Sequence, residues 1–166
     1  MLERRIILVM GPAGSGKSTV AEHLSHETNW PMIEADDHHP EANRKKMASG
    51  NPLTDQDRAA WIDSLAKACR DHSSNSIVLA CSALTPYVQT RLLNEVKRSI
   101  IWVLLEVPAD VLQARLEART DHFMPASQLQ DQLAALKAPE GALLIDADRS
   151  VAEITDSIRS ALEDQT

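Results

Sequence analysis

Aromatic residues and long apolar runs are both scarce in this sequence of 166 residues. Phe, Trp and Tyr together make up 3% of the chain, so the core must be built mainly from Leu, Ile, Val and Ala. No apolar stretch reaches the roughly 18 residues that a helix needs to cross a bilayer. The N-terminal residues enter an apolar run at once and show no signal-peptide cleavage pattern. We therefore expect a cytoplasmic protein without a membrane span.

Positive charge and cysteine are also in short supply. The net charge of −7 argues against a nucleic-acid-binding surface, which needs clustered Lys and Arg. An acidic protein can still bind a nucleotide if its cations are concentrated in one pocket. Cys69 and Cys81 form neither a C-x-x-C pair nor a metal-ligand spacing, so we expect two reduced, buried thiols. The length fits one domain over residues 1–166.

Apolar runs of strand length alternate with segments of helical spacing. The predicted strands cover residues 5–10, 31–35, 76–80, 99–105 and 142–145. The predicted helices cover residues 17–27, 55–72 with Asp55 as N-cap, 86–97, 108–118, a short one ending near Pro139, and 151–162. Such alternation predicts an α/β fold, with a parallel sheet covered by helices on both faces. Ligands of such sheets bind at the carboxyl ends of the strands.

A phosphate-binding motif follows the first predicted strand and opens the first predicted helix. The pattern G-x-x-x-x-G-K-[ST] is matched by Gly11-Pro12-Ala13-Gly14-Ser15-Gly16-Lys17-Ser18. Its glycines let the backbone curl so that N–H groups point at phosphate oxygens. Lys17 would reach the β and γ phosphates, and the Ser18 hydroxyl would ligate Mg²⁺. We therefore predict binding of ATP through Gly11, Ala13, Gly14, Ser15, Gly16, Lys17, Ser18 and Thr19.

The residues after the second predicted strand carry a resemblance to a known family. They run Glu34-Ala35-Asp36-Asp37-His38-His39-Pro40, followed by Asn43, Lys46-Met47, Gly50, Pro52-Leu53, Asp55, Asp57-Arg58 and Trp61. This pattern resembles that of the gluconate kinase family, with Glu34 in place of the first acidic residue. Further matches are Cys81-Ser82-Ala83-Leu84, His122-Phe123 and the Asp146-x-Asp148 turn.

The resemblance covers almost the whole chain and has clear implications. It implies a three-layer P-loop NTPase fold of the nucleoside-monophosphate-kinase type, with a five-stranded parallel sheet, helices on both faces and a lid at about residues 119–127. It also implies transfer of the ATP γ-phosphate to a sugar acid, by resemblance the 6-hydroxyl of D-gluconate, to give 6-phospho-D-gluconate. A homodimer is the assembly that the family suggests.

Three residues of this pattern are candidates for binding the acceptor. Asp36 would accept the proton of the attacking hydroxyl, as a kinase requires. His39 would hydrogen-bond a substrate hydroxyl, and Arg58 would clamp a carboxylate. Each has a structural alternative: Asp36 or His39 as a helix cap, and Arg58 in an ion pair on a helix surface.

Two arginines are candidates for binding ATP and for stabilising the charge that develops during transfer. Arg115 and Arg119 are four residues apart, which predicts one helix face, and they precede or open the polar stretch 119–127. Arg119 would act on the transferring phosphoryl group. The stretch would close as a lid and exclude water. The alternative is a pair of solvated arginines.

One segment departs from the family pattern. Where the family has a basic cluster, roughly K-x-x-Y-R-x-x-L-R, this chain reads Thr85-Pro86-Tyr87-Val88-Gln89-Thr90-Arg91-Leu92-Leu93. Arg91 could supply a relocated guanidinium, the acceptor could be a related polyol or another sugar acid, or the domain could serve as a nucleotide-dependent regulatory module. A kinase for shikimate or a nucleoside monophosphate is a further alternative. No acidic residue follows the third strand, so no metal ligand beyond Ser18 is predicted.

Overall fold

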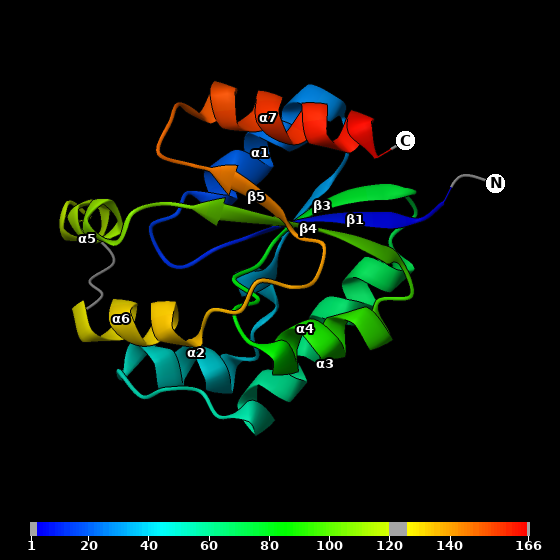
Figure 1. The fold of residues 1–166 in the computed structure, drawn as a ribbon. Coiled ribbons are helices and arrows are strands. Elements are labelled where there is room, and N and C mark those ends of the chain that lie inside the picture. Colours follow the sequence, from blue (N-terminus) through cyan, green and yellow to red (C-terminus); the bar gives the residue numbers. More distant parts are fainter. Residues whose placement is uncertain (1–2, 120–125, 166) are drawn as a thin grey trace.

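The computed structural model describes residues 3–119 and 126–165. Its centre is a sheet of five parallel strands (Figure 1). The strands are β1 (Arg5–Met10), β2 (Met32–Glu34), β3 (Ser76–Ala80), β4 (Ser99–Glu106) and β5 (Leu143–Asp146). They lie in the order β2-β3-β1-β4-β5, so β1 occupies the middle of the sheet.

Helices cover both faces of the sheet (Figure 1). They are α1 (Lys17–Thr28), the 3₁₀ helix η1 (Ala35–His38), α2 (Glu41–Ala48), α3 (Asp55–Asp71), α4 (Pro86–Glu95), α5 (Ala109–Glu117), α6 (Ala126–Ala135) and α7 (Val151–Asp164). Helices α1 and α7 pack on one face, and α3 and α4 on the other. The predicted α/β fold with a five-stranded parallel sheet is confirmed. Among the described helices, none has the length and apolar character of a membrane span.

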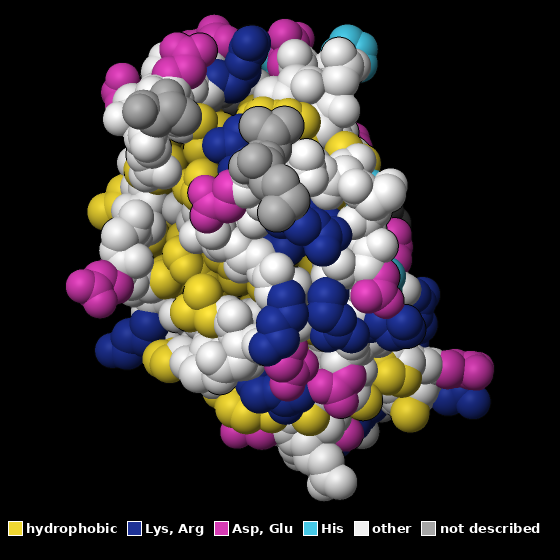
Figure 2. Space-filling model, turned by 90° about the vertical axis from the view of Figure 1, so that its right-hand side faces the viewer, with side chains coloured by type: hydrophobic (Ala, Val, Ile, Leu, Met, Phe, Trp, Pro, Cys, Tyr) yellow, Lys and Arg dark blue, Asp and Glu magenta, His cyan; other side chains and the backbone are white. Residues whose placement is uncertain are grey.

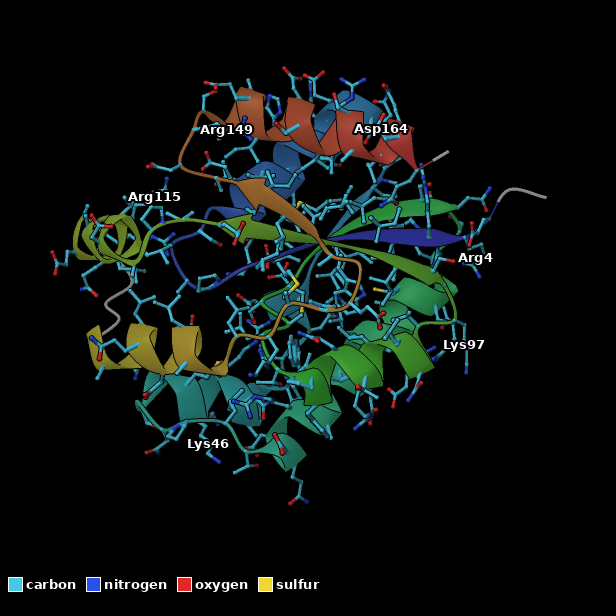
Figure 3. All side chains as sticks on the ribbon, in the orientation of Figure 1. Arg4, Lys46, Lys97, Arg115, Arg149 and Asp164 are labelled. Atoms are coloured by element: carbon cyan, nitrogen blue, oxygen red, sulfur yellow. The ribbon has the colours of Figure 1, made fainter. Side chains whose placement is uncertain are left out.

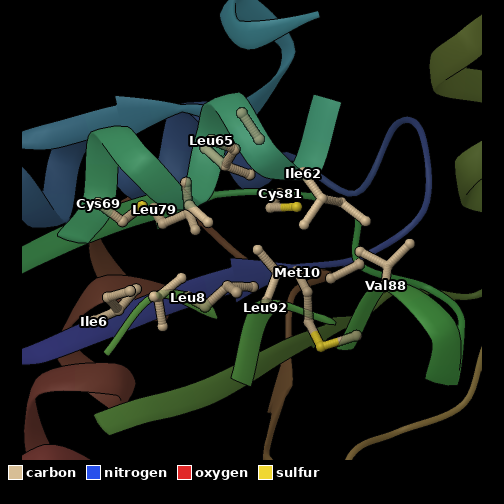
Figure 4. Close-up of a cluster of buried hydrophobic side chains, with 14 of the residues drawn as sticks. Ile6, Leu8, Met10, Ile62, Leu65, Cys69, Leu79, Cys81, Val88 and Leu92 are labelled. Carbon is tan, nitrogen blue, oxygen red and sulfur yellow. The ribbon is translucent and has the colours of Figure 1, made fainter. Parts of the chain in front are cut away.

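Strand β1 supplies both halves of the core, because successive side chains of a strand point to opposite faces. Ile6, Leu8 and Met10 pack with α3 and α4 (Figure 4), whereas Ile7 and Val9 pack with α1 and α7. All five side chains are fully buried. A strand buried on both faces reads as a continuous apolar run, which is why this strand was predicted within its observed bounds.

Several predicted boundaries differ from the structure. Asp55 is the first residue of α3 and not its N-cap, because the Thr54 hydroxyl accepts the N–H of Asp57 and the Asp57 side chain accepts the N–H of Thr54. Pro108 precedes α5 as its N-cap, and α6 ends at Ala135, short of Pro139. Helix α2 was not predicted, since only Asn43 of its eight residues is buried and no apolar periodicity marks it.

Lys and Arg side chains gather on the face that carries both termini (Figure 2), which is opposite to the carboxyl ends of the strands. Arg4 on this face and the buried Arg98 beneath it are bound to backbone carbonyls. Arg98 donates to the carbonyls of Cys69, His72, Ser74 and Asn75, and Arg4 donates to those of Arg70 and His72. These arginines satisfy the last carbonyls of α3 and the turn after it, which are the groups that a helix leaves unpaired. Arg4 and Arg98 thus have a structural role at this end of α3.

Candidate active site

The loop between β1 and α1 has the backbone of a phosphate cradle. It contains three of the five glycines of the chain: Gly11, Gly14 and Gly16. Gly14 has φ +84°, and a Cβ there would lie 3.3 Å from Leu116 Cγ of α5. Gly16 has φ +88° as the N-cap of α1 and offers no side-chain cap, so the first N–H groups of the helix remain open for a ligand. The buried Ser15 hydroxyl also lacks a hydrogen-bond partner among the described residues. These features fit a bound polyphosphate.

Lys17 lies half-buried at the start of α1. Partial burial lowers the pKa of its ammonium, while the carboxyl groups of Asp36 and Glu34 act in the opposite direction. Asp36 comes from η1, so the structure brings Lys17 and Asp36, predicted from separate motifs, within electrostatic range of each other. A partly desolvated cation favours the approach of an anion such as a phosphate.

Glu34 is a site residue that the sequence analysis did not select. The Ser18 hydroxyl donates to Glu34 Oε2 at 2.6 Å. Burial raises the pKa of the Glu34 carboxyl, and the bond from Ser18 partly offsets this effect. Hydroxyl and carboxylate oxygens are ligands suited to Mg²⁺. The signal was present in the sequence, because Glu34 occupies the first acidic position of the family pattern at the end of β2.

No protein-only metal cluster exists in the part of the chain that the structure describes: no group of three or more His, Cys, Asp or Glu residues could hold an ion there. Mg²⁺ normally keeps several waters and uses substrate phosphates together with one or two carboxylates. The pair Ser18 and Glu34 fits that mode of binding. A metal at this place would therefore need the nucleotide as a co-ligand.

The acceptor side is organised by Trp61 of α3. Its indole Nε1 donates to the Ala35 carbonyl at 2.8 Å, which ties η1 to α3. The His39 ring stacks on the Trp61 ring with centroids 4.6 Å apart and an interplanar angle of 12°. Because η1 also contains Asp36, this contact positions Asp36 and His39 together at the carboxyl end of β2.

Hydrogen bonds determine which nitrogen of His39 carries the proton. The Asn43 amide Nδ2 donates to the Asp57 carbonyl at 2.9 Å, which fixes the orientation of that amide. The same Nδ2 lies 3.3 Å from His39 Nδ1, which must then accept. Burial lowers the pKa of His39 and favours the neutral ring, with its proton on Nε2. His39 thus presents an Nε2–H donor that has no partner among the described residues.

The structure places Arg58 and Arg91 in ion pairs. Arg58 Nη1 lies 3.3 Å from Asp55 Oδ1, which is the helix-surface alternative for this residue. Arg91 is more fully engaged: its guanidinium contacts Asp63 at 2.6 Å and Glu95 at 2.7 Å, and it donates to the Tyr87 hydroxyl. These contacts join α4 to α3. They argue against Arg91 as the relocated carboxylate clamp, because each of its three nitrogens already has a partner.

The two arginines near the predicted lid have different surroundings. Helix α5 ends at Glu117, so Arg119 lies beyond it and the prediction that both share one helix face is wrong. Arg115 lies on α5 (Figure 3) and donates to the Gly14 carbonyl at 3.1 Å and the Ala147 carbonyl at 3.5 Å. It thereby links the phosphate loop to the loop after β5. Arg119 is exposed, and its charge contributes to the lowered pKa of Lys17.

The remaining predictions for this region concern the lid and the cysteines. The lid was predicted at about residues 119–127, of which 120–125, with His122 and Phe123, lie outside the described residues; it stays a prediction.

Cys69 and Cys81 are free and buried, as predicted. Burial raises the pKa of both thiols to about 12. Cys81 therefore lies near Lys17 as a protonated packing residue and not as a nucleophile.

Comparisons with known proteins agree with this geometry. The family model described as an AAA domain matches residues 6–139. A gluconokinase of Gluconobacter oxydans (strain 621H) is 40% identical over 140 residues, covering 83% of this chain and 78% of that protein. A probable gluconokinase of Mus musculus is 37% identical over 179 residues, covering 95% of this chain and 97% of that protein.

The likeness extends to three dimensions. The crystal structure of a gluconokinase from Sinorhizobium meliloti 1021 superposes with a TM-score of 0.81 at 34% identity, covering 99% of this chain and 98% of that one. The phosphate loop, the Asp36–Trp61 segment and the order of the strands thus occur together in one fold. On these grounds the chain belongs to the gluconokinase family.

Proposed function

We propose that this protein is an ATP-dependent kinase that transfers the γ-phosphate of ATP to a hydroxyl of D-gluconate, giving 6-phospho-D-gluconate. The proposal rests mainly on the placement of Asp36 within electrostatic range of Lys17. The two residues follow the carboxyl ends of β2 and β1, which lie on either side of β3. One residue belongs to the phosphate loop and the other to the acceptor segment. The gluconokinase names of the relatives support gluconate as the acceptor.

The phosphate loop would hold the nucleotide. Backbone N–H groups at the start of α1 would bind phosphate oxygens, aided by the positive end of the helix dipole. Lys17 would neutralise the β and γ phosphates. Ser18 and Glu34 would hold Mg²⁺, which, when bound, neutralises charge on the phosphate oxygens. Arg115 would keep the loop in shape through its bond to the Gly14 carbonyl.

The acceptor would lie between η1 and the phosphate loop. Asp36 would orient the attacking hydroxyl and accept its proton as the bond to phosphorus forms. His39 would donate from Nε2 to a neighbouring hydroxyl, since its Nδ1 is already occupied by Asn43. The stacking of His39 on Trp61 holds that donor in a fixed direction. A polyhydroxylated acceptor suits this combination of one carboxylate and one neutral donor.

A specific observation favours a second candidate acceptor, another sugar acid or a polyol. The basic cluster of the family is replaced by residues 85–93, and Arg91 in that segment is held by Asp63 and Glu95. Arg58 likewise has a partner in Asp55. Both guanidinium groups already have a carboxylate partner in this structure, Arg91 through Nε and Nη2 and Arg58 through Nη1 alone. The carboxylate of gluconate would therefore need another cation, the remaining donors of Arg58 or a rearrangement of these pairs.

An acceptor panel tests the proposal. We would measure ADP release in a coupled assay with Mg·ATP and, in turn, gluconate, other aldonates, keto-acids, polyols, shikimate and nucleoside monophosphates. We expect gluconate to accelerate ADP release far above the background without acceptor. The control is Lys17→Ala, which we expect to abolish turnover while keeping the native circular dichroism spectrum.

The outcomes separate the candidates. Acceleration by another sugar acid or polyol alone would replace gluconate and keep the kinase mechanism. No acceleration by any acceptor, in a protein that still binds ATP, would contradict the kinase proposal and favour a regulatory role. A folded Lys17→Ala variant with near-normal turnover would overturn the assignment of the phosphate loop.

A further inference from the structure

Helix α6 contacts the phosphate loop through a single polar side chain. The backbone N–H of Ala13 donates to the side-chain carbonyl Oε1 of Gln132 at 2.9 Å. Lys137, two residues after the end of α6, contacts the residues that follow β3. Its N–H donates to the Leu84 carbonyl at 2.9 Å, and its carbonyl accepts from Gln89 Nε2 of α4 at 2.7 Å. The chain from Gln132 to Lys137 therefore spans the distance between the nucleotide cradle and the segment after β3.

A small apolar cluster fixes α6 in this place. Leu112 and Leu116 of α5 and Leu129 of α6 are buried together, and Ala13 and Leu133 pack against them. This cluster joins α5 and α6 to the first half of the phosphate motif, at Ala13. The bond between Ala13 and Gln132 is thus a supported contact, made by a half-buried side chain on a packed helix.

The chemistry of the amide determines how Gln132 is oriented. Because the Ala13 N–H can only donate, its partner must be the carbonyl oxygen of Gln132 and not the amide nitrogen. The Nε2 group, with two N–H donors, then points elsewhere. Within the described ranges of the chain, nothing accepts a hydrogen bond from it. An amide with one end bound and the other end open beside a phosphate cradle is suited to an anionic oxygen.

The position of Gln132 indicates which phosphate it would meet. The transferable phosphate must face the acceptor, which lies on the side of η1 and the segment after β3. Gln132 contacts the phosphate loop at Ala13, and Lys137, five residues later, contacts that segment at Leu84. We therefore expect the γ-phosphate to lie within reach of Gln132, and the α-phosphate to lie farther along the cradle toward α1.

We propose that Gln132 is a γ-phosphate-binding residue: its Oε1 holds the Ala13 N–H, and its Nε2 donates to an oxygen of the terminal phosphate of ATP. The inference deepens the proposed function, on which it rests for the use of ATP, and concerns the nucleotide and not the acceptor. It makes α6 a sensor of the triphosphate, because ADP lacks the group that Nε2 binds.

The variant Gln132→Glu tests this role with little change in shape. A carboxylate keeps an acceptor for the Ala13 N–H but replaces the Nε2 donor by an oxygen that repels phosphate. We would measure the binding of Mg·AMP-PNP and of Mg·ADP by isothermal titration calorimetry. We expect the affinity for the triphosphate analogue to fall by about 10- to 100-fold, the worth of one hydrogen bond to a charged group, and that for ADP to change by less than about twofold.

The matched control is Gln130→Glu, which adds the same charge to an exposed position of the same helix. It should leave both affinities within about twofold of the wild-type values. Gln132→Met keeps the length and removes both polar ends; it serves as the second variant if Gln132→Glu does not fold. For that variant too, we expect a larger loss for the triphosphate analogue than for ADP.

The outcomes distinguish this inference from the proposed function. Equal losses for AMP-PNP and ADP would mean that Gln132 only shapes the loop, and no loss for either would mean that it does not contribute; both results overturn the inference. A wild-type protein that binds neither nucleotide would refute the proposed function itself. A selective loss for the triphosphate analogue supports the role of Gln132.

Discussion

Asp57, in the first turn of α3, accepts hydrogen bonds from two neighbouring residues. Its Oδ2 accepts from Lys46 Nζ of α2 at 2.6 Å and from the backbone N–H of Thr54 at 2.9 Å. The hydrogen bond from Lys46 is the main cause that lowers the pKa of Asp57 from 3.8 to about 2. A carboxyl whose pKa is lower in the folded state stabilises the fold only while it is ionised. The Asp57–Lys46 pair therefore contributes above pH 3.8, and the contribution is lost as the pH falls from 3.8 toward 2.

The variant Lys46→Met should reveal this pH dependence. It removes the partner of Asp57, so the free energy of unfolding should be lower than that of the wild type at pH 6. The difference should shrink as the pH falls through the window from 3.8 to about 2, where the wild-type pair also disappears. Urea unfolding at a series of pH values measures it. Lys45→Met is the control, since Lys45 pairs with Glu41 at 3.6 Å on the open surface. A difference independent of pH would contradict the assignment.

Arg119 is the described arginine that remains available for the transferring phosphoryl group. It lies just after α5, is exposed, and acts electrostatically on Lys17. An arginine that acts on the transition state in a P-loop enzyme is worth about 10³ to 10⁵ in rate. We expect Arg119→Ala to lower kcat by a large factor and to change the KM for ATP much less.

Steady-state kinetics with ATP and the best acceptor of the panel measures this effect. Arg159→Ala is the control, because Arg159 pairs with Glu27 at 3.6 Å between α7 and α1. It should leave both constants close to the wild-type values. If Arg119→Ala keeps the wild-type kcat, the residue acts outside the transition state.

At the scale of elements, α3 does the most to position the acceptor site. Its first turn provides the capping box of Thr54 and Asp57, its second turn provides Trp61, and its buried face completes the core over β1 and β3. The Trp61 indole holds η1 through its hydrogen bond to the Ala35 carbonyl. Fraying at the start of α3 would therefore loosen the placement of Asp36 and His39. The cap is therefore linked to the geometry of the acceptor site.

The variant Thr54→Ala tests how much the cap stabilises the fold. Loss of an N-cap hydroxyl costs about 0.5–2 kcal/mol of stability, so the midpoint of urea unfolding should fall accordingly. Ser64→Ala, at an exposed position in the middle of the same helix, should be neutral or slightly stabilising because alanine favours helices. A Thr54→Ala variant as stable as the wild type would show that the capping box contributes nothing to the fold.

The elements differ in how well they could be predicted. Strands β1 and β3 were predicted within their bounds because they are apolar and lie inside the sheet. Helix α2 has no such signal, since its contacts to α3 are polar: Asn43 reaches the Asp57 carbonyl, and Lys46 reaches the Asp57 side chain. A helix held by hydrogen bonds and an ion pair leaves little periodicity in its sequence.

At the scale of the whole molecule, the order of the strands creates the site. Strand β3 lies between β1 and β2, so the ends of these three strands meet at one edge of the sheet. The phosphate loop follows β1, Asp36 follows β2 and Cys81 follows β3, which explains why Asp36 acts electrostatically on Lys17. On the opposite face, Arg4 and Arg98 are bound to backbone carbonyls. These two cations are thus used in the structure, and Lys17 lies at the phosphate loop although the chain as a whole has a net charge of −7.

The sequence by itself determined the phosphate motif, the alternation of strands and helices, the family and the Asp36–Trp61 segment. These are local patterns, in which the chemistry depends on residue types at a fixed spacing. Only the tertiary structure decided which side chains are free to act. It paired Arg91 with Asp63, and it brought Glu34 to Ser18 and Gln132 to Ala13. Such contacts join residues on separate elements, and their partners depend on how those elements pack, which no local pattern records.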